Sequence, residues 1–257
     1  MTVVRAKRGL AVVVAMVAMG LLSGCAVFSG SEDEGNDQAD WHYEMGQGYF
    51  ESQDTTHAIR ELSEAVKLDP DHADAHHLLG FIYMGRRDHQ RAVHHFEETL
   101  RIRPEYYTAM NNLGSVFLAQ GRWDEAAEVF EELVDQTLYT TPELAHNNLG
   151  WAYHQMGRHA EALEHLRRAS YLAPEMCLAD NNKGRVYQEM GNANRAERHF
   201  RRAIEKCPQD YQEPHYYLGR LMQDQGDDNA SAHFQRCIEI RGHNDLAERC
   251  RQFLQLQ

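Results

Sequence analysis

The sequence predicts an all-α chain built from repeated helical hairpins, and three observations carry that prediction. Glycines recur at intervals of 34, 34, 36, 34 and 35 residues, and a series of alanines keeps almost the same period. Residues that favour helix, such as Ala, Leu, Glu and Arg, fill the intervals. Each of the 6 prolines falls at a junction or in the first turn of a predicted helix. The two series are Gly46, Gly80, Gly114, Gly150, Gly184 and Gly219, and Ala58, Ala92, Ala126, Ala162, Ala196 and Ala230.

The first predicted element is a secretory signal peptide over residues 1–24. Three basic residues, Arg5, Lys7 and Arg8, precede an apolar stretch from Leu10 to Leu22, and small residues follow it. A membrane-spanning helix needs about 20 apolar residues, and this stretch is shorter. The alternative is an uncleaved anchor helix.

The end of this segment, Leu22-Ser23-Gly24-Cys25, resembles the lipobox of bacterial lipoproteins. The resemblance implies that Cys25 becomes the first residue after cleavage and carries diacylglycerol and further fatty acyl chains such as palmitate. Several acyl chains on one residue give stable anchoring. Ala26 rather than Asp follows the cysteine, which in the sorting pattern of Gram-negative bacteria implies the outer membrane, with the protein facing the periplasm.

The second predicted element, residues 25–38, is the lipidated N-terminus with a flexible tether. Val27 to Gln38 is acidic, contains Ser, Gly and Asn, and has almost no apolar residue beyond Phe28. A segment of this composition cannot bury a face, so it is expected to be flexible.

The third predicted element, residues 39–241, consists of the six repeats. An aromatic residue follows the glycine by three positions in five copies, and pairs such as Leu79-Gly80 and Leu113-Gly114 recur. This pattern resembles the tetratricopeptide repeat (TPR), in which small residues let two antiparallel helices approach each other. The resemblance implies a right-handed superhelical solenoid. Residues 242–257, with Asn244 as a start signal, are the predicted C-terminal capping helix.

Composition and motifs exclude several kinds of function. A net charge of −13 and a pI near 5.6 argue against nucleic-acid binding. We find no phosphate-binding glycine loop, no Cys-x-x-Cys and no catalytic constellation, so we predict neither an enzyme nor a cofactor or small-molecule substrate. The histidines closest to a cluster, His72 with His76 and His94 with His95, lack a partner set, and we predict no metal site.

The four cysteines after Cys25 are candidates for two disulfides. In the repeat register, Cys177 opens the first helix of the fifth copy and Cys207 closes its second helix. Cys237 and Cys250 flank the last turn almost symmetrically. An oxidising periplasm favours bonds between Cys177 and Cys207 and between Cys237 and Cys250, and buried free thiols are the alternative.

First helices line the inner face of such a solenoid, and three copies carry an Asn-Asn pair there. An Asn amide both donates and accepts, so a ladder of Asn112, Asn148 and Asn182 is predicted to hold an extended peptide of a protein partner. Side-chain selectivity is assigned to Phe81, Trp151 and Arg185. The alternative is that the Asn residues only satisfy neighbouring helices.

The longer interval before Gly150 comes from Asp135-x-x-Leu138-Tyr139-x-x-Pro142, which Gln155 to Ala162 follows. This stretch, with the lipobox, resembles the type IV pilus biogenesis TPR lipoproteins, including the social gliding motility lipoprotein. The resemblance implies a pilotin, a scaffold that binds the outer-membrane secretin during its localisation and assembly and so supports twitching and social motility. The alternative is another periplasmic TPR adaptor lipoprotein, one that regulates peptidoglycan enzymes or outer-membrane protein assembly.

Overall fold

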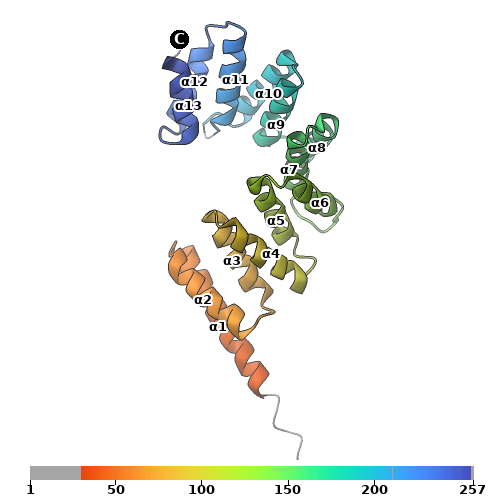
Figure 1. The fold of residues 1–257 in the computed structure, drawn as a ribbon, viewed down its shortest axis with the longest axis vertical. Helices are drawn as coiled ribbons and strands as arrows, with labels where there is room; N and C mark the ends of the chain where they lie inside the picture. The colour runs from red at the N-terminus through yellow and green to blue at the C-terminus, as the bar shows by residue number, and fades with distance from the viewer. Residues whose placement is uncertain (1–29, 210, 256–257) are drawn as a thin grey trace, which may run out of the picture. The chain divides into compact units, whose positions relative to one another are not determined.

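The computed structural model describes residues 30–209 and 211–255, with side chains from residue 36 onward. The predicted signal peptide, the lipobox and Cys25 lie outside the described residues. All regular structure in the described part of the chain is helical, in thirteen α-helices (Figure 1). No helix among the described residues has both the length and the apolar character that crossing a bilayer requires.

Twelve of these helices form six antiparallel pairs, as the repeat period predicted. The pairs are α1 (Gly30–Glu51) with α2 (Thr55–Leu68), α3 (Ala73–Gly85) with α4 (His89–Ile102), α5 (Tyr107–Gln120) with α6 (Trp123–Val134), α7 (Pro142–Gln155) with α8 (His159–Leu172), α9 (Cys177–Glu189) with α10 (Ala193–Lys206), and α11 (Glu213–Asp224) with α12 (Ala230–Ile240). The thirteenth helix, α13 (Asp245–Gln255), follows the last pair.

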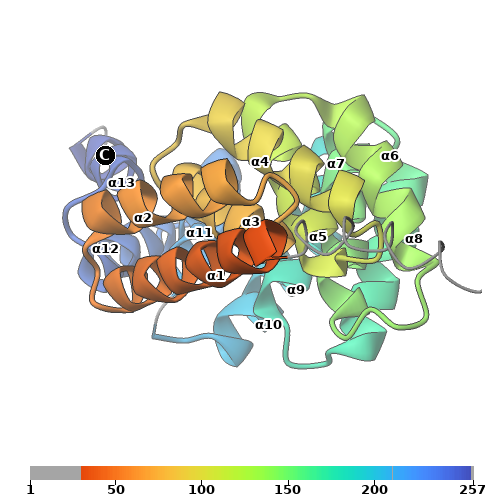
Figure 2. The ribbon, with the colours of Figure 1, turned by 90° about the horizontal axis from the view of Figure 1, so that it is seen from below.

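The helices fall into two compact units, of which the first ends at His72. In this unit α1 and α2 run side by side as one hairpin (Figure 2). A Cβ added to Gly46 would lie 2.6 Å from Leu62 Cγ, so the glycine permits the close contact of the two helices. Ala58, Leu62 and Ala65 are fully buried against α1.

The start of α1 differs from the prediction, because residues 30–38 were expected to belong to a flexible tether. The structure places them in the helix, which begins at Gly30. Extending a helix that is already formed costs little, since each added residue gains one backbone hydrogen bond. The part of α1 that packs on α2 nucleates the helix, which then extends through residues 30–38, although their composition alone would not start a helix.

The second unit, from Ala73 onward, contains the remaining eleven helices. Each second helix packs on the first helix of its own pair and on the first helix of the next pair. The repeat glycines bring the helices of a pair together: a Cβ on Gly184 would lie 2.5 Å from Phe200 Cε1. Phe96, Phe130, Phe200 and Phe234 occupy this position in four copies and are fully buried.

The predicted capping helix is present as α13, which packs against α11 and α12 (Figure 1). The Asn244 side chain accepts a hydrogen bond from the Ala247 backbone N–H at 2.8 Å, as expected of an N-cap. Phe253 stacks on Phe234, with ring centroids 5.1 Å apart. The apolar face of the last repeat is therefore covered, as a repeat array requires at its end.

Candidate functional site

The Asn-Asn pairs form a chain of hydrogen bonds between successive first helices. Asn182 on α9 donates from Nδ2 to Asn147 Oδ1 on α7 at 3.0 Å. Asn147 in turn donates to its neighbour Asn148 at 3.2 Å, and Asn148 donates to Asn111 Oδ1 on α5 at 3.4 Å. The amides therefore connect three consecutive repeats to one another.

This arrangement corrects the prediction for Asn182. Its side chain belongs to a residue only 4% exposed, so a bound peptide cannot reach it. The physical reason is the spacing of first helices, which is short enough for one Asn amide to satisfy the next. The alternative reading of the Asn pairs, as groups that satisfy neighbouring helices, is the correct one for this residue.

Asn148 and Asn112 are half-buried and have internal contacts of their own. Asn112 Nδ2 lies 3.4 Å from His77 Nε2 on α3. Burial lowers the pKa of His77, which keeps the ring neutral and able to accept from an amide. A role for Asn112 and Asn148 in peptide binding stays a prediction, with any partner competing against these bonds.

Trp151 and Arg185 form one stacked group rather than two separate anchors. The Arg185 guanidinium carbon lies 4.0 Å from the centroid of the Trp151 ring and 4.6 Å from that of Tyr217. The stack spans α7, α9 and α11, and all three residues are half-buried. Cation–π pairs of this kind contribute about 0.5–2 kcal/mol each. Phe81 on α3 is 41% exposed and presents an apolar ring to solvent.

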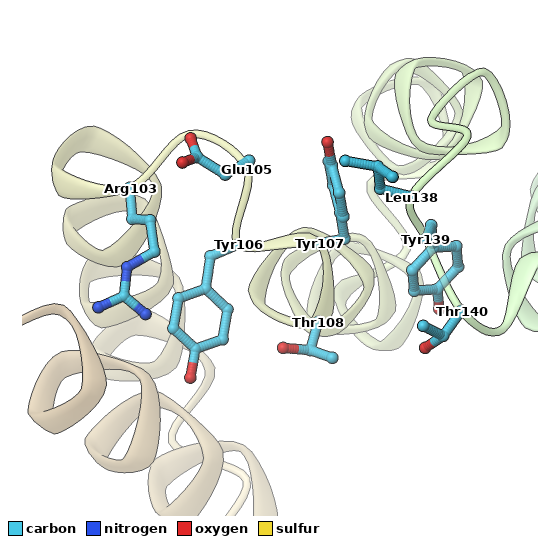
Figure 3. Close-up of a pocket in the computed structure, with 8 residues that line it drawn as sticks. All are labelled: Arg103, Glu105, Tyr106, Tyr107, Thr108, Leu138, Tyr139 and Thr140. Carbon is cyan, nitrogen blue, oxygen red and sulfur yellow. The ribbon is translucent and has the colours of Figure 1, made fainter.

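The inserted segment before α7 forms a hollow of about 250 Å³ with the α4–α5 turn (Figure 3). Tyr106 and Tyr107 line it from the turn, and Leu138 and Tyr139 line it from the insertion. Leu138 is 76% exposed, whereas Tyr139 is 6% exposed and meets Tyr107 edge to face. The sequence predicted the insertion but not the hollow. The signal for the hollow was the apolar Leu138 within a polar inserted segment.

One wall of the hollow is fixed by polar contacts to Asp74. Arg103 donates to both carboxylate oxygens of Asp74, at 3.2 and 3.1 Å. The Tyr106 hydroxyl donates to the same carboxylate at 2.9 Å. A bidentate Arg–carboxylate pair holds its partners in one geometry, so Tyr106 lines a preformed surface.

Two disulfides lie in the last two repeats and at the cap. Cys177 is bonded to Cys207 across the open end of the α9–α10 pair, with the Cα atoms 6.0 Å apart. Cys237 on α12 is bonded to Cys250 on α13, with the Cα atoms 6.5 Å apart. The second bond ties the capping helix covalently to the last repeat.

Histidine pairs inside the hairpins were missed from the sequence. His76 and His95 meet through their Nδ1 atoms at 3.0 Å, and the equivalent pairs in the fourth and sixth repeats are as close. Burial lowers the pKa of His95 to about 4. The signal that identifies them is a spacing of 18 or 19 residues between a first-helix His and a second-helix His.

A buried carboxylate in the fifth repeat was also missed. Asp180 is fully buried and is contacted by Lys183 at 2.7 Å, by His199 at 3.0 Å and by Lys206. Burial alone would raise the pKa of Asp180, but hydrogen bonds from these three side chains outweigh it and hold the pKa well below its usual range.

The architecture defines an all-α repeat protein that presents side chains from successive helices to other proteins. Family models of the tetratricopeptide repeat match residues 71–137 and 105–174, a further TPR repeat model matches 46–85, and another tetratricopeptide repeat model matches 181–207. The chain belongs to the tetratricopeptide-repeat family. Such repeats typically serve as non-enzymatic scaffolds that bind other proteins.

Solved structures are similar to the chain at low identity. PilW, described as a widely conserved type IV pilus biogenesis factor, is 19% identical with a TM-score of 0.71, covering 82% of this chain and 96% of PilW. PilF of Pseudomonas aeruginosa is 20% identical with a TM-score of 0.67, covering 88% and 99%. MamA of Desulfovibrio magneticus RS-1 is 24% identical with a TM-score of 0.61, covering 66% and 95%. A search of curated proteins gave no match. At these identities the similarity establishes the fold.

Proposed function

We propose that this protein is a lipid-anchored TPR scaffold of the outer membrane that binds the type IV pilus secretin and promotes its localisation and assembly. The observation that carries the proposal is the structural match to PilF and PilW over nearly their whole length, 99% and 96%. The lipobox-like Leu22-Ser23-Gly24-Cys25 supports the same function, because a lipid on Cys25 would keep the repeats beside the outer membrane.

Binding in this proposal needs no covalent chemistry. The hollow at the insertion offers the exposed Leu138 beside Tyr107, and the first helices offer Phe81 and the Trp151–Arg185 stack. Aromatic residues and Arg are the types that carry most binding energy at protein interfaces. An extended secretin segment with one or two apolar side chains fits these features.

The test is an immunoblot for the secretin on unboiled samples from a strain that lacks this gene. The proposal expects loss of heat-resistant secretin multimers with normal envelope growth, and recovery when the wild-type gene is restored. Intact multimers together with altered cell shape would instead indicate the peptidoglycan or outer-membrane assembly adaptor, and would reject the pilotin.

Two variants separate anchoring from binding. Cys25→Ser is expected to leave the outer-membrane fraction and to lose multimers, because the lipid is absent. Leu138→Asp is expected to remain in the outer membrane and still lower the multimer level, because it places a charge in the apolar part of the hollow. Leu172→Asp, at another partly exposed Leu (37%), is the matched control and should leave the multimers unchanged. Equal effects of Leu138→Asp and Leu172→Asp on the multimer level would show that the hollow is not part of the binding surface.

A further inference from the structure

Three potential metal ligands meet where the fourth and fifth repeats touch. His154 lies in the last turn of α7, His159 is the first residue of α8, and Glu189 is the last residue of α9. Glu189 Oε2 lies 3.2 Å from His154 Nδ1 and 3.8 Å from His159 Nε2. One ligand atom from each of the three residues lies within 4.8 Å of the others.

The His154 ring is buried without a hydrogen-bond partner for Nδ1. Its side chain is 4% exposed, and Nδ1 makes no hydrogen bond, because the nearby Glu189 Oε2 does not lie in hydrogen-bonding geometry. An unsatisfied buried ring nitrogen costs about 1–3 kcal/mol and requires an explanation. The other members are open to solvent, with Glu189 60% and His159 27% exposed, so an ion can enter from that side.

We propose that His154, His159 and Glu189 form a binding site for a zinc ion. Two imidazoles and one carboxylate are a known zinc ligand set that leaves a fourth position for water or for a group from a partner. Bonds of about 2.0–2.2 Å at tetrahedral angles separate ligand atoms by roughly 3.3–3.6 Å. The two separations from Glu189 are 3.2 and 3.8 Å, and the two histidine ligand atoms lie within 4.8 Å of each other, so side-chain movement of about 1 Å would reach that geometry.

The histidine pairs elsewhere in the described hairpins provide the contrast. His146 and His165 face each other at 3.1 Å, so each Nδ1 has the other as its partner. No group of three potential ligands other than His154, His159 and Glu189 was found among the described residues. The proposed zinc would link the α7–α8 turn to the end of α9 and so fix the fifth repeat on the fourth.

Calorimetric titration of the full-length, chelator-treated protein in detergent with zinc chloride tests the site. We expect one equivalent bound with a dissociation constant in the micromolar range or below. His159→Ala and Glu189→Gln should each weaken binding at least tenfold; both side chains are partly exposed, so the fold is expected to tolerate the changes. The matched controls His94→Ala and Glu175→Gln, at exposed positions away from the cluster, should bind as wild type.

A second measurement uses the proximity of Trp151, whose ring centroid lies 4.9 Å from that of His154. In a chain carrying Trp41→Phe and Trp123→Phe, Cu²⁺ should quench the remaining fluorescence saturably at one equivalent. Because Cu²⁺ binds such ligands more tightly than Zn²⁺, prior addition of a large excess of Zn²⁺ should raise the Cu²⁺ concentration that quenching requires. Adding His159→Ala should abolish this response while the melting temperature stays within a few degrees. Quenching or zinc binding that His159→Ala and Glu189→Gln leave unchanged would overturn the proposal.

Discussion

His146 Nδ1 lies 3.1 Å from His165 Nδ1, so the two helices of the fourth repeat meet through a pair of imidazole rings. One ring donates its N–H and the other accepts, so the accepting ring must be neutral. The same relationship joins His76 to His95 and His215 to His233, at 3.0 Å each. Each pair places two groups that bind protons readily in water inside a helical hairpin.

Mild acid should destabilise the protein through these pairs. Burial, with the charge of the partner histidine, lowers the pKa of His146 and of His215 to about 4, whereas an unfolded chain has histidines near pH 6.5. Between these values the unfolded state binds more protons, so the free energy of unfolding falls as the pH falls from about 6.5 to about 4. The expected loss is on the order of 1 kcal/mol for each pair after allowance for solvent screening.

Urea unfolding at pH 7.0 and pH 5.0 checks this prediction, since most carboxylates remain ionised over that range. The double variant His146→Gln with His165→Gln keeps polar side chains but removes two titrating groups. Its free energy of unfolding should change less with pH than that of the wild type. An identical pH dependence would show that the pair does not control acid stability.

Removal of the Asp180 charge should cost about 3–5 kcal/mol. The carboxylate compensates Lys183, which is 6% exposed, and Lys206, and Asp180→Ala leaves these charges without their acceptor. Thermal unfolding is the measurement, and Asp228→Ala, at an exposed position in the following repeat, is the control. A melting temperature for Asp180→Ala equal to that of the control would contradict the prediction.

A methyl group at Gly184 should destabilise the fifth repeat by about 1–3 kcal/mol. The new Cβ would lie 2.5 and 2.6 Å from two carbons of the Phe200 ring, which is fully buried and cannot move away freely. Gly85→Ala is the matched control in the same unit, because nothing lies within 4 Å of its Cβ. Denaturant midpoints should fall for Gly184→Ala and stay level or rise for Gly85→Ala; equal midpoints would argue against close packing.

Reduction of the disulfides should lower stability. The bonds close segments of 30 and 13 residues, and each contributes roughly 3 kcal/mol in the loop-entropy model. The unfolded, unreduced protein should show no free thiol among the four cysteines after Cys25, and reductant should release four thiols and lower the melting temperature. Detection of four thiols before reduction would exclude both bonds.

The sequence was sufficient to predict the repeated hairpins, because the same period of about 34 residues sets both the close helix contact at each repeat glycine and the position of each turn. The repeat period predicts the close helix contact at Gly150, where an added Cβ would meet Leu166 and the Ala162 carbonyl. The N-cap signal predicts the start of the last helix at Asn244. The Asn182–Asn147 bond could not be predicted in this way, because it depends on how near two first helices lie across separate repeats. His154, His159 and Glu189 come from three helices, so only the packing of those helices brings the three side chains together.

The bond between Cys237 and Cys250 has a consequence for how proteases degrade the protein. Linear repeat arrays open most readily from a free end, where one helix peels away at the expense of a single interface. Here the terminal helix cannot separate from α12 while the bond is intact, even if its packing is lost for a moment. The disulfide thus prevents the C-terminal helix from unfolding alone, and proteolysis that starts at this end requires unfolding of a larger part of the repeat array.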